Sequence, residues 1–330
     1  MTPSLLQHRG DAPVPPVAGT AREEDRYLQA AFRYHSRTFS LATRLLPKPV
    51  RLPVATLYLY CRTVDELADS RALVVGRAQA LAEADEIERN LDAALAGRPR
   101  PGRHPLLWRR LARVHAVSGL RPGPLHELID GARWDLRETP VRTWDDLLAY
   151  ADLVAGSVGA MMLPFLARDR ADFDALDMPA RALGNAMQLT NIARDVGEDW
   201  RELGRTYLPD EGLAAHDLTA AALFAGGEDV RVRYAALMEE LMGRAEVLYD
   251  QAAAGIDRLR PAAQTGIRAA ARMYREILNG VRANAYDNLD QRAVVPLRRK
   301  VQAVIGNTYT RRRDGLATRI DLVGTARRGR

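Results

Sequence analysis

The sequence predicts an all-α fold, a single-domain helical bundle around a central cavity. Stretches rich in Ala, Leu, Arg and Glu fill most of the 330 residues, aromatic residues make up only 6%, and alternating β-branched runs are nearly absent. An apolar content of 47% supports a substantial buried core. One cavity is the simplest arrangement, because sites in bundles are built from side chains that face inward on opposed helices.

Pro and Gly signals give the bounds of the expected helices in chain order. The first 20 residues are rich in Pro and contain no long apolar run, so we interpret them as a disordered lead. Helices are then expected at residues 23–46, 53–68, 77–96, 105–118, 124–138, 143–167, 179–196, 218–226, 230–259 and 261–288. Breaks are expected at 47–53, 97–105, 119–124, 139–142 and 204–212. Residues 21–305 form the expected domain, and 306–330 a basic, mobile tail.

Composition excludes several kinds of function. The net charge is +6, but the Arg residues are dispersed among acids, so nucleic-acid binding is not favoured. The single cysteine, Cys61, excludes an internal disulfide and fits a reducing cytoplasm. Because Cys61 lies in an apolar run with no flanking His, we do not expect it to be a nucleophile. The chain has no run of 18 consecutive apolar residues, so no membrane-spanning helix is expected.

Two acidic pairs share one spacing. Asp65 and Asp69 form the first pair, and Asp195 and Asp199 form the second. Residues four apart share a helix face, where two carboxylates repel each other unless a cation lies between them. Mg²⁺ prefers such oxygen ligands and commonly binds one or two carboxylates together with substrate phosphates. The spacing alone is weak, because 26 Asp residues produce about two such pairs by chance.

Polar neighbours make each pair part of a longer stripe. The first stripe consists of Tyr58, Arg62, Asp65 and Asp69, and the second of Gln188, Asn191, Asp195 and Asp199. Both follow steps of three and four residues, which place them along one helix face. Apolar residues such as Leu57 and Met187 occupy the other positions. We therefore expect both stripes to face a polar cavity, although a solvent-facing stripe has the same pattern.

A third cation follows the second stripe. Arg205 lies between Gly204 and Pro209, on a loop where a guanidinium could make a bidentate contact with phosphate. The alternative is a surface Arg that pairs with Glu202 or Asp210. The loop alone does not decide between these two interpretations.

At this point the chain resembles the squalene/phytoene synthases, prenyltransferases that join two isoprenoid diphosphates head to head, and most of all bacterial phytoene synthases. The matching segments, in family order, are residues 35–40 (HSRTFS), 58–62 (YLYCR) with 65–69 (DELAD), Tyr150 with 154–159 (VAGSVG), 188–199 (QLTNIARDVGED) with 205–209, and 274–295. They cover roughly residues 30 to 300. Such collinearity is far more specific than any one motif.

The resemblance implies a type I isoprenoid synthase fold and a role for each matching residue. The implied metal ligands are Asp65, Asp69, Asn191, Asp195 and Asp199, with Mg²⁺ as the ion and Mn²⁺ as its alternative. The implied catalytic residues are these four aspartates together with Tyr58, Tyr150 and Tyr274. The implied substrate-binding residues are His35, Phe39, Arg62, Val154, Val158, Gln188, Asn191, Arg205 and Arg292.

The resemblance also implies a reaction. Two geranylgeranyl diphosphates would condense through a cyclopropylcarbinyl diphosphate to phytoene, for carotenoid biosynthesis, without NADPH. Small residues at Thr43 and Ala55 are interpreted as leaving a tunnel long enough for C20 chains. The alternatives are a relative that uses C15 farnesyl diphosphate to make squalene, dehydrosqualene or presqualene diphosphate, and a non-catalytic scaffold with the same fold. The implied location is cytoplasmic with peripheral membrane contact, because the product is a lipid.

Overall fold

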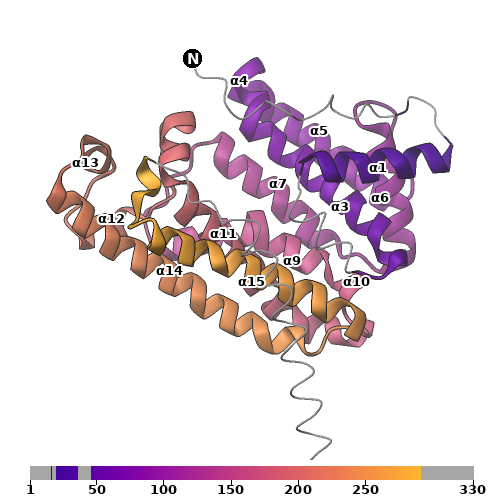
Figure 1. The fold of residues 1–330 in the computed structure, drawn as a ribbon. Coiled ribbons are helices and arrows are strands. Elements are labelled where there is room, and N and C mark those ends of the chain that lie inside the picture. The colour runs from indigo at the N-terminus through magenta and orange to yellow at the C-terminus, as the bar shows by residue number, and fades with distance from the viewer. Residues whose placement is uncertain (1–15, 17–19, 36–45, 291–330) are drawn as a thin grey trace, which may run out of the picture.

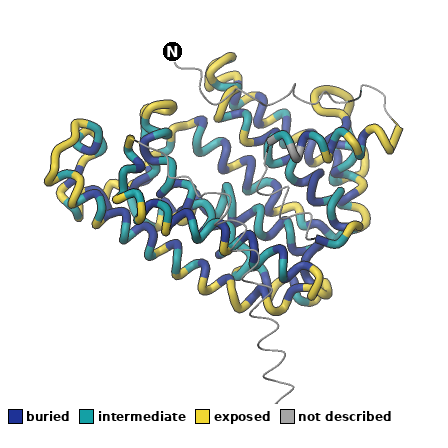
Figure 2. Tube along the Cα trace, in the orientation of Figure 1, coloured by how far each residue is buried: buried dark blue, intermediate teal, exposed yellow. Residues whose placement is uncertain are grey.

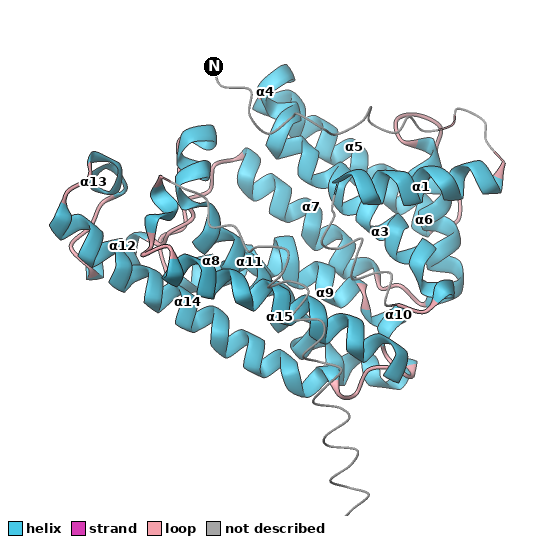
Figure 3. Ribbon diagram, in the orientation of Figure 1, coloured by secondary structure: helices cyan, strands magenta, loops and turns pink. Residues whose placement is uncertain are grey.

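The computed structural model describes residue 16 and residues 20–35 and 46–290, and within these ranges the regular structure is helical (Figure 3). The one β-type contact in this part of the chain is an isolated bridge between Ala167 and Leu259. The prediction of an all-α fold is therefore confirmed. The proposed N-terminal lead and basic tail lie almost wholly outside the described residues, as do Phe39, Thr43 and Arg292, and of His35 only the backbone is described.

The N-terminal half packs around the helix of the first acidic motif. Its elements are α1 (Ala21–His35), α3 (Lys48–Glu66), the π-helix η1 (Leu67–Arg71), α4 (Ala72–Val75), α5 (Arg77–Leu95), α6 (Pro105–Ser118) and α7 (Pro122–Leu136). Helix α3 contacts α1, α6 and α7 (Figure 1). Tyr60 of α3 is fully buried against Trp108, and its hydroxyl donates a 2.7 Å hydrogen bond to the carbonyl of Leu125 on α7.

The C-terminal half is built around a long helix that carries the second acidic motif. Its elements are α8 (Trp144–Ala151), the π-helix η2 (Asp152–Gly156), α9 (Ser157–Met161), α10 (Leu163–Leu166), η3 (Arg170–Asp172), α11 (Phe173–Leu203), α12 (Asp210–Ala215), α13 (Ala220–Ala225), α14 (Glu228–Ile256), α15 (Pro261–Ala283) and η4 (Asp287–Leu289). Helix α11 packs along α14 and α15, which run side by side in Figure 1. The faces turned toward one another are buried, while the outer turns are exposed (Figure 2).

Several predicted bounds are wrong, and proline explains two of them. Helix α3 begins at Lys48 and contains Pro53, so the break expected at 47–53 is absent. Helix α11 begins at Phe173 and runs through Pro179 to Leu203, well beyond the expected 179–196. A proline inside a helix removes one backbone hydrogen bond. A helix that packs tightly against its neighbours tolerates that loss. Helix α12, within and beyond the expected 204–212 loop, was not predicted.

The segment that includes residues 154–159 packs unusually close to α11. A Cβ atom on Gly159 would lie 2.1 Å from the carbonyl oxygen of Ala180, and one on Gly184 would lie 2.1 Å from that of Ala155. Only glycine permits such an approach of two backbones. The glycines of this motif therefore bring η2 and α9 against the helix of the second acidic motif.

One helical stretch, Trp144–Leu166, has the length and apolar character of a membrane span. It was not expected to pass such a test. About 44% of its most apolar window is buried inside the protein, and Val154, Val158 and Leu166 line an internal cavity. Packing around that cavity accounts for part of the apolar character of the stretch.

Candidate active site

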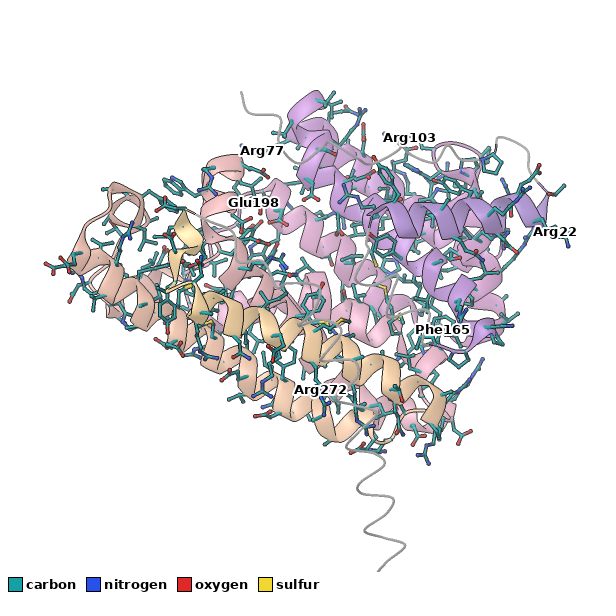
Figure 4. All side chains as sticks on the ribbon, viewed as in Figure 1. Arg22, Arg77, Arg103, Phe165, Glu198 and Arg272 are labelled. Carbon is teal, nitrogen blue, oxygen red and sulfur yellow. The ribbon has the colours of Figure 1, made fainter. Side chains whose placement is uncertain are left out.

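A cavity of about 360 Å³ lies between α3, the η2–α10 segment, α11, α14 and α15. Its walls are mostly apolar, and its polar groups gather toward one end. That end carries the polar side chains Tyr58, Asp65, Gln188, Asn191 and Tyr274. Figure 4 shows Glu198 of the second acidic motif and Phe165 of α10 far apart in the view. The two stripes predicted from sequence thus meet at one cavity, through Tyr58 and Asp65 and through Gln188 and Asn191. The other stripe members, Arg62, Asp69, Asp195 and Asp199, are not among the residues that line it.

The first acidic motif lies where α3 changes into the π-helix η1. Asp65 is on α3 and Asp69 is on η1, so a widened turn separates them, a feature that recurs at functional sites. Arg62 pairs with Asp69 at 3.2 Å and with Glu66 at 3.0 Å. The surrounding protein, and next the charge of Asp69, raise the pKa of Asp65 to about 7. The Asp65 side chain is still reached by solvent. We therefore place this carboxylate on the wall of the cavity and not in a sealed core.

The second acidic motif lies on the last turns of α11. Asp195 accepts a 2.7 Å hydrogen bond from Nε of the adjacent Arg194, which makes a second contact through Nη2. Burial, and then the charges of Asp195 and Glu198, raise the pKa of Asp199 to about 7. Both motifs therefore contain a carboxylate whose negative charge is not balanced by the arginines around it.

Two tyrosines connect the motif helices at the polar end. Tyr58 of α3 and Tyr274 of α15 interact electrostatically, and Tyr274 also interacts with Arg194 and Asp195. Burial raises the pKa of Tyr58 to about 12 and also raises that of Tyr274, so both are neutral hydroxyls. Cys61 lies on the same wall, and burial raises the pKa of its thiol, which agrees with the prediction that it is not a nucleophile.

A cluster beside the cavity joins Arg205 to Tyr150 through a residue that the sequence did not single out. Asp135 of α7 accepts hydrogen bonds from Arg205 (2.7 Å), Tyr207 (2.8 Å) and Tyr150 (3.0 Å). Arg205 therefore pairs with Asp135, and neither Glu202 nor Asp210 is its partner, contrary to the surface alternative. The Tyr150 and Tyr207 rings stack at 4.9 Å.

This cluster lies between the two acidic motifs. Asp135 interacts electrostatically with both Asp65 and Asp69, and Arg205 interacts with Asp199. Asp69 in turn interacts with Glu202, beyond the second motif. The two motifs are thus within electrostatic reach of one another. Asp135 belongs to the candidate site and was not singled out from the sequence, whereas Arg194 and Tyr207 lay in matching segments without an assigned role.

The opposite end of the cavity is apolar. Leu176, Ala180, Ala252 and Ile256 are among its lining residues. The turn between α14 and α15 covers this end and is tied to the end of α10, since the Arg260 amide donates a 2.9 Å hydrogen bond to the Leu166 carbonyl. The bridge between Ala167 and Leu259 joins the same two segments.

Other predicted residues have mixed outcomes. Val154 and Val158 line the cavity, and their role as substrate-binding residues stays a prediction. Leu57 and Met187 also line it, although the stripe pattern placed them elsewhere. Ala55 does not limit the tunnel, because it is buried against Leu28 and Leu106, on the side of α3 that faces α1 and α6. Since the relevant side of a helix depends on what packs against it, side-chain size alone could not assign Ala55.

The oxygen ligands at the polar end fit a hard divalent cation. The donors are carboxylates and the Asn191 amide. Burial first, and then repulsion from neighbouring carboxylates, raises the pKa values of Asp65 and Asp199, and a cation would relieve that repulsion. Within the described residues, no three His, Cys, Asp or Glu side chains come together as a complete metal site. A cation here would therefore need oxygen ligands from a diphosphate and from water.

Comparison with known proteins adds family information to this geometry. The model of the squalene/phytoene synthase family matches residues 32–299. A 15-cis-phytoene synthase from Synechococcus elongatus is 38% identical over 290 residues, which cover 85% of this chain and 90% of that protein. The chloroplastic phytoene synthase 3 of Zea mays is 35% identical, covering 86% of this chain and 68% of the relative.

Solved structures show the same fold. A dehydrosqualene synthase crystallised with a ligand superposes with a TM-score of 0.76 at 31% identity, over 88% of this chain and 97% of the other. The squalene synthase HpnC from Alicyclobacillus acidocaldarius gives a TM-score of 0.70 at 26% identity, over 80% and 95% of the two chains.

Proposed function

Because the chain belongs to the squalene/phytoene synthase family of prenyltransferases, we propose that it condenses two geranylgeranyl diphosphates head to head to form phytoene. The reaction passes through a cyclopropylcarbinyl diphosphate, and its product enters carotenoid biosynthesis. The observation that carries this proposal is a cavity with a polar end, built from Tyr58 and Asp65 of the first stripe and Gln188 and Asn191 of the second, and a long apolar remainder. The phytoene synthases among its relatives support the choice of product.

The charged end suits the binding of prenyl diphosphates, the substrate class on which the family acts. Arg62 and Arg205 provide guanidinium donors that can contact phosphate oxygens in a bidentate manner. The proposed metal ligands are Asp65, Asp69, Asn191, Asp195 and Asp199. When bound with the diphosphate, Mg²⁺, or Mn²⁺ in its place, supplies neutralisation of the charge that develops on the leaving group. The family's divalent-metal dependence agrees with this donor set.

The neutral tyrosines are suited to the reacting carbon atoms. Tyr58 and Tyr274 line the cavity beside the charged end, and their hydroxyl dipoles and ring faces can stabilise positive charge on an allylic carbon. Tyr150 is buried outside the cavity lining and donates a hydrogen bond to Asp135, which interacts electrostatically with Asp65. Gln188 lines the same end and completes its polar surface.

The apolar remainder of the cavity has two proposed roles. It shields the carbocation from water, and its length limits the length of the prenyl tail. Val154, Val158 and their neighbours exclude water, which would otherwise capture a carbocation. Asn191 and Leu176 mark the two ends of the cavity along α11, and a helix rise of about 1.5 Å per residue separates them by about 22 Å. An isoprene unit adds four bonds of about 1.5 Å and extends a chain by roughly 5 Å, so four units, a C20 tail, match this length.

The test is a product assay with purified protein. Incubation with Mg²⁺ and geranylgeranyl diphosphate should give phytoene without NADPH, because the last cation loses a proton and is not reduced. Parallel incubations with farnesyl diphosphate, with and without NADPH, test the C15 alternative. Exclusive C30 product would contradict the phytoene assignment, and no product from either substrate would favour a non-catalytic scaffold.

We also propose a cytoplasmic location with peripheral membrane contact. The product is a hydrocarbon that must leave for a lipid phase, and Leu73 and Val74 of α4 are each 77% exposed. Co-flotation with anionic lipid vesicles tests this contact, and a Leu73→Ser, Val74→Ser variant should float less. Equal flotation of the variant would rule out α4 as the contact.

A further inference from the structure

We propose that Asp135 is a positioning residue that fixes the hydroxyl of Tyr150 and the guanidinium of Arg205 beside the two acidic motifs. Asp135 belongs to neither motif and lies on a different helix, α7. The inference rests on the proposed function, because that function supplies the reaction in which Tyr150 and Arg205 take part. Its geometric basis is independent of which prenyl chain is the substrate.

The two carboxylate oxygens of Asp135 have separate partners. Oδ1 accepts hydrogen bonds from Nη2 of Arg205 (2.7 Å) and from the Tyr207 hydroxyl (2.8 Å). Oδ2 accepts one from the Tyr150 hydroxyl (3.0 Å). Only 14% of the Asp135 side chain is exposed, so these bonds are shielded from competing water.

The direction of the Tyr150 hydrogen bond follows from the chemistry of the groups. An ionised carboxylate only accepts hydrogen bonds, so the proton of Tyr150 points toward Oδ2. Stacking on Tyr207 at 4.9 Å holds the plane of the ring. With its proton committed to Asp135, the Tyr150 hydroxyl can act toward any further partner only as an acceptor. An acceptor held in this way is suited to stabilise positive charge in the proposed carbocation reaction.

The same carboxylate also holds Arg205. Both hydrogen bonds that Arg205 makes within the described residues use Nη2, with Asp135 at 2.7 Å and Tyr207 at 3.0 Å. The donors on Nε and Nη1 remain for phosphate oxygens. Since Arg205 also interacts electrostatically with Asp199, Asp135 keeps this cation between the two motifs.

A purely structural role explains Asp135 poorly. Asp135 interacts unfavourably with the carboxylates of Asp65 and Asp69, so its charge adds to repulsion that already exists there. A neutral acceptor would satisfy Tyr150 and Tyr207 without that cost. The charged residue is accounted for if the site requires a fixed acceptor for Tyr150 and a fixed partner for Arg205.

Asp135→Asn separates these two tasks. Arg205 can only donate, so the amide oxygen should stay at the Oδ1 position and the amide nitrogen should face Tyr150. The amide then donates to the Tyr150 hydroxyl, which reverses that hydrogen bond while Arg205 keeps its partner. The matched control is Asp130→Asn on the same helix, because Asp130 is 57% exposed and pairs only with Arg133 on the outer face among the described residues.

The experiment measures steady-state kinetics and thermal unfolding of the full chain with Mg²⁺ and geranylgeranyl diphosphate. D135N should lower kcat by about tenfold to a hundredfold, the usual range for a residue that orients an active-site group, with KM changed less than about threefold. D130N should match the wild type. Tyr150→Phe should lower kcat as well, and adding D135N to it should cost little more, because both act through one hydroxyl.

The proposal is overturned if folded D135N keeps the wild-type kcat, or if its loss multiplies with that of Y150F. If D135N does not fold, Asp135→Glu provides the same readout, since it keeps the charge but moves the oxygens by one methylene. A lowered kcat in D135E supports the proposal, and a wild-type kcat overturns it. If the wild type converts only farnesyl diphosphate, the proposed product is wrong, and the same comparison is made with that substrate.

Discussion

Ala180 should set the longest prenyl chain that the cavity accepts. Its side chain lines the cavity on α11, eleven residues before Asn191. At about 1.5 Å per residue this places it about 16 Å from the polar end. A C15 tail of about 15 Å would end at this level, whereas the last isoprene unit of a C20 tail extends beyond it. Replacing Ala180 with Leu should therefore obstruct the longer chain selectively.

The expected size of the effect follows from the added volume. Leu adds three carbon atoms, which displace a similar number from the end of a C20 tail. At about 0.8 kcal/mol per buried carbon group, the loss is about 2.4 kcal/mol. Since about 1.4 kcal/mol corresponds to a factor of ten, kcat/KM for geranylgeranyl diphosphate should fall about fiftyfold relative to that for farnesyl diphosphate.

The assay is a competition between the two diphosphates, with hydrocarbon products quantified by chain length. Ala175→Leu is the control, because Ala175 is on the same helix with its side chain exposed. A folded A180L protein with the wild-type preference for chain length would refute the proposal that the apolar end of the cavity holds the end of the prenyl tail. A similar change in A175L would indicate an effect on the helix itself.

Four further predictions concern the charged end and its support. Asp195→Asn should abolish turnover but leave thermal unfolding nearly unchanged, since it removes charge from a metal site; near-normal turnover would contradict that role. Because Asp65 and Asp199 have pKa values raised to about 7, they are protonated below that pH, so calorimetry should show Mg²⁺ affinity falling at least tenfold from about pH 8 to about pH 6. Without metal, the same raised pKa values make the folded state bind more protons than the unfolded state between about pH 4 and pH 7. The free energy of unfolding should therefore fall as pH rises through that range, and the opposite slope would refute the raised pKa values. Gly184→Ala should reduce the free energy of unfolding by about 3 kcal/mol in denaturant titration, since its Cβ would lie 2.1 Å from the Ala155 carbonyl; wild-type stability would show that the two backbones can separate.

The helical fold was predictable because it depends on local pattern, whereas several helix ends depend on tertiary contacts. Composition and periodicity gave the all-α class correctly. Proline was given too much weight at Pro53 and Pro179, where packing on both sides keeps the helix continuous. The two π-turns, at residues 67–71 and 152–156, have no sequence signature of their own, although each adjoins a predicted motif.

The candidate site was predictable only where its residues repeat along one helix. Tyr58 and Asp65, like Gln188 and Asn191, follow a helical period, so one sequence shows that they share a face. Asp135 has no such pattern, and nothing near it in the sequence distinguishes it from the exposed carboxylates of the same helix. Its importance arises from three donors brought by other segments, which only the packing of α7 against the rest of the bundle determines. Contacts between helices, not motifs along them, therefore decide how the two acidic stripes become one site.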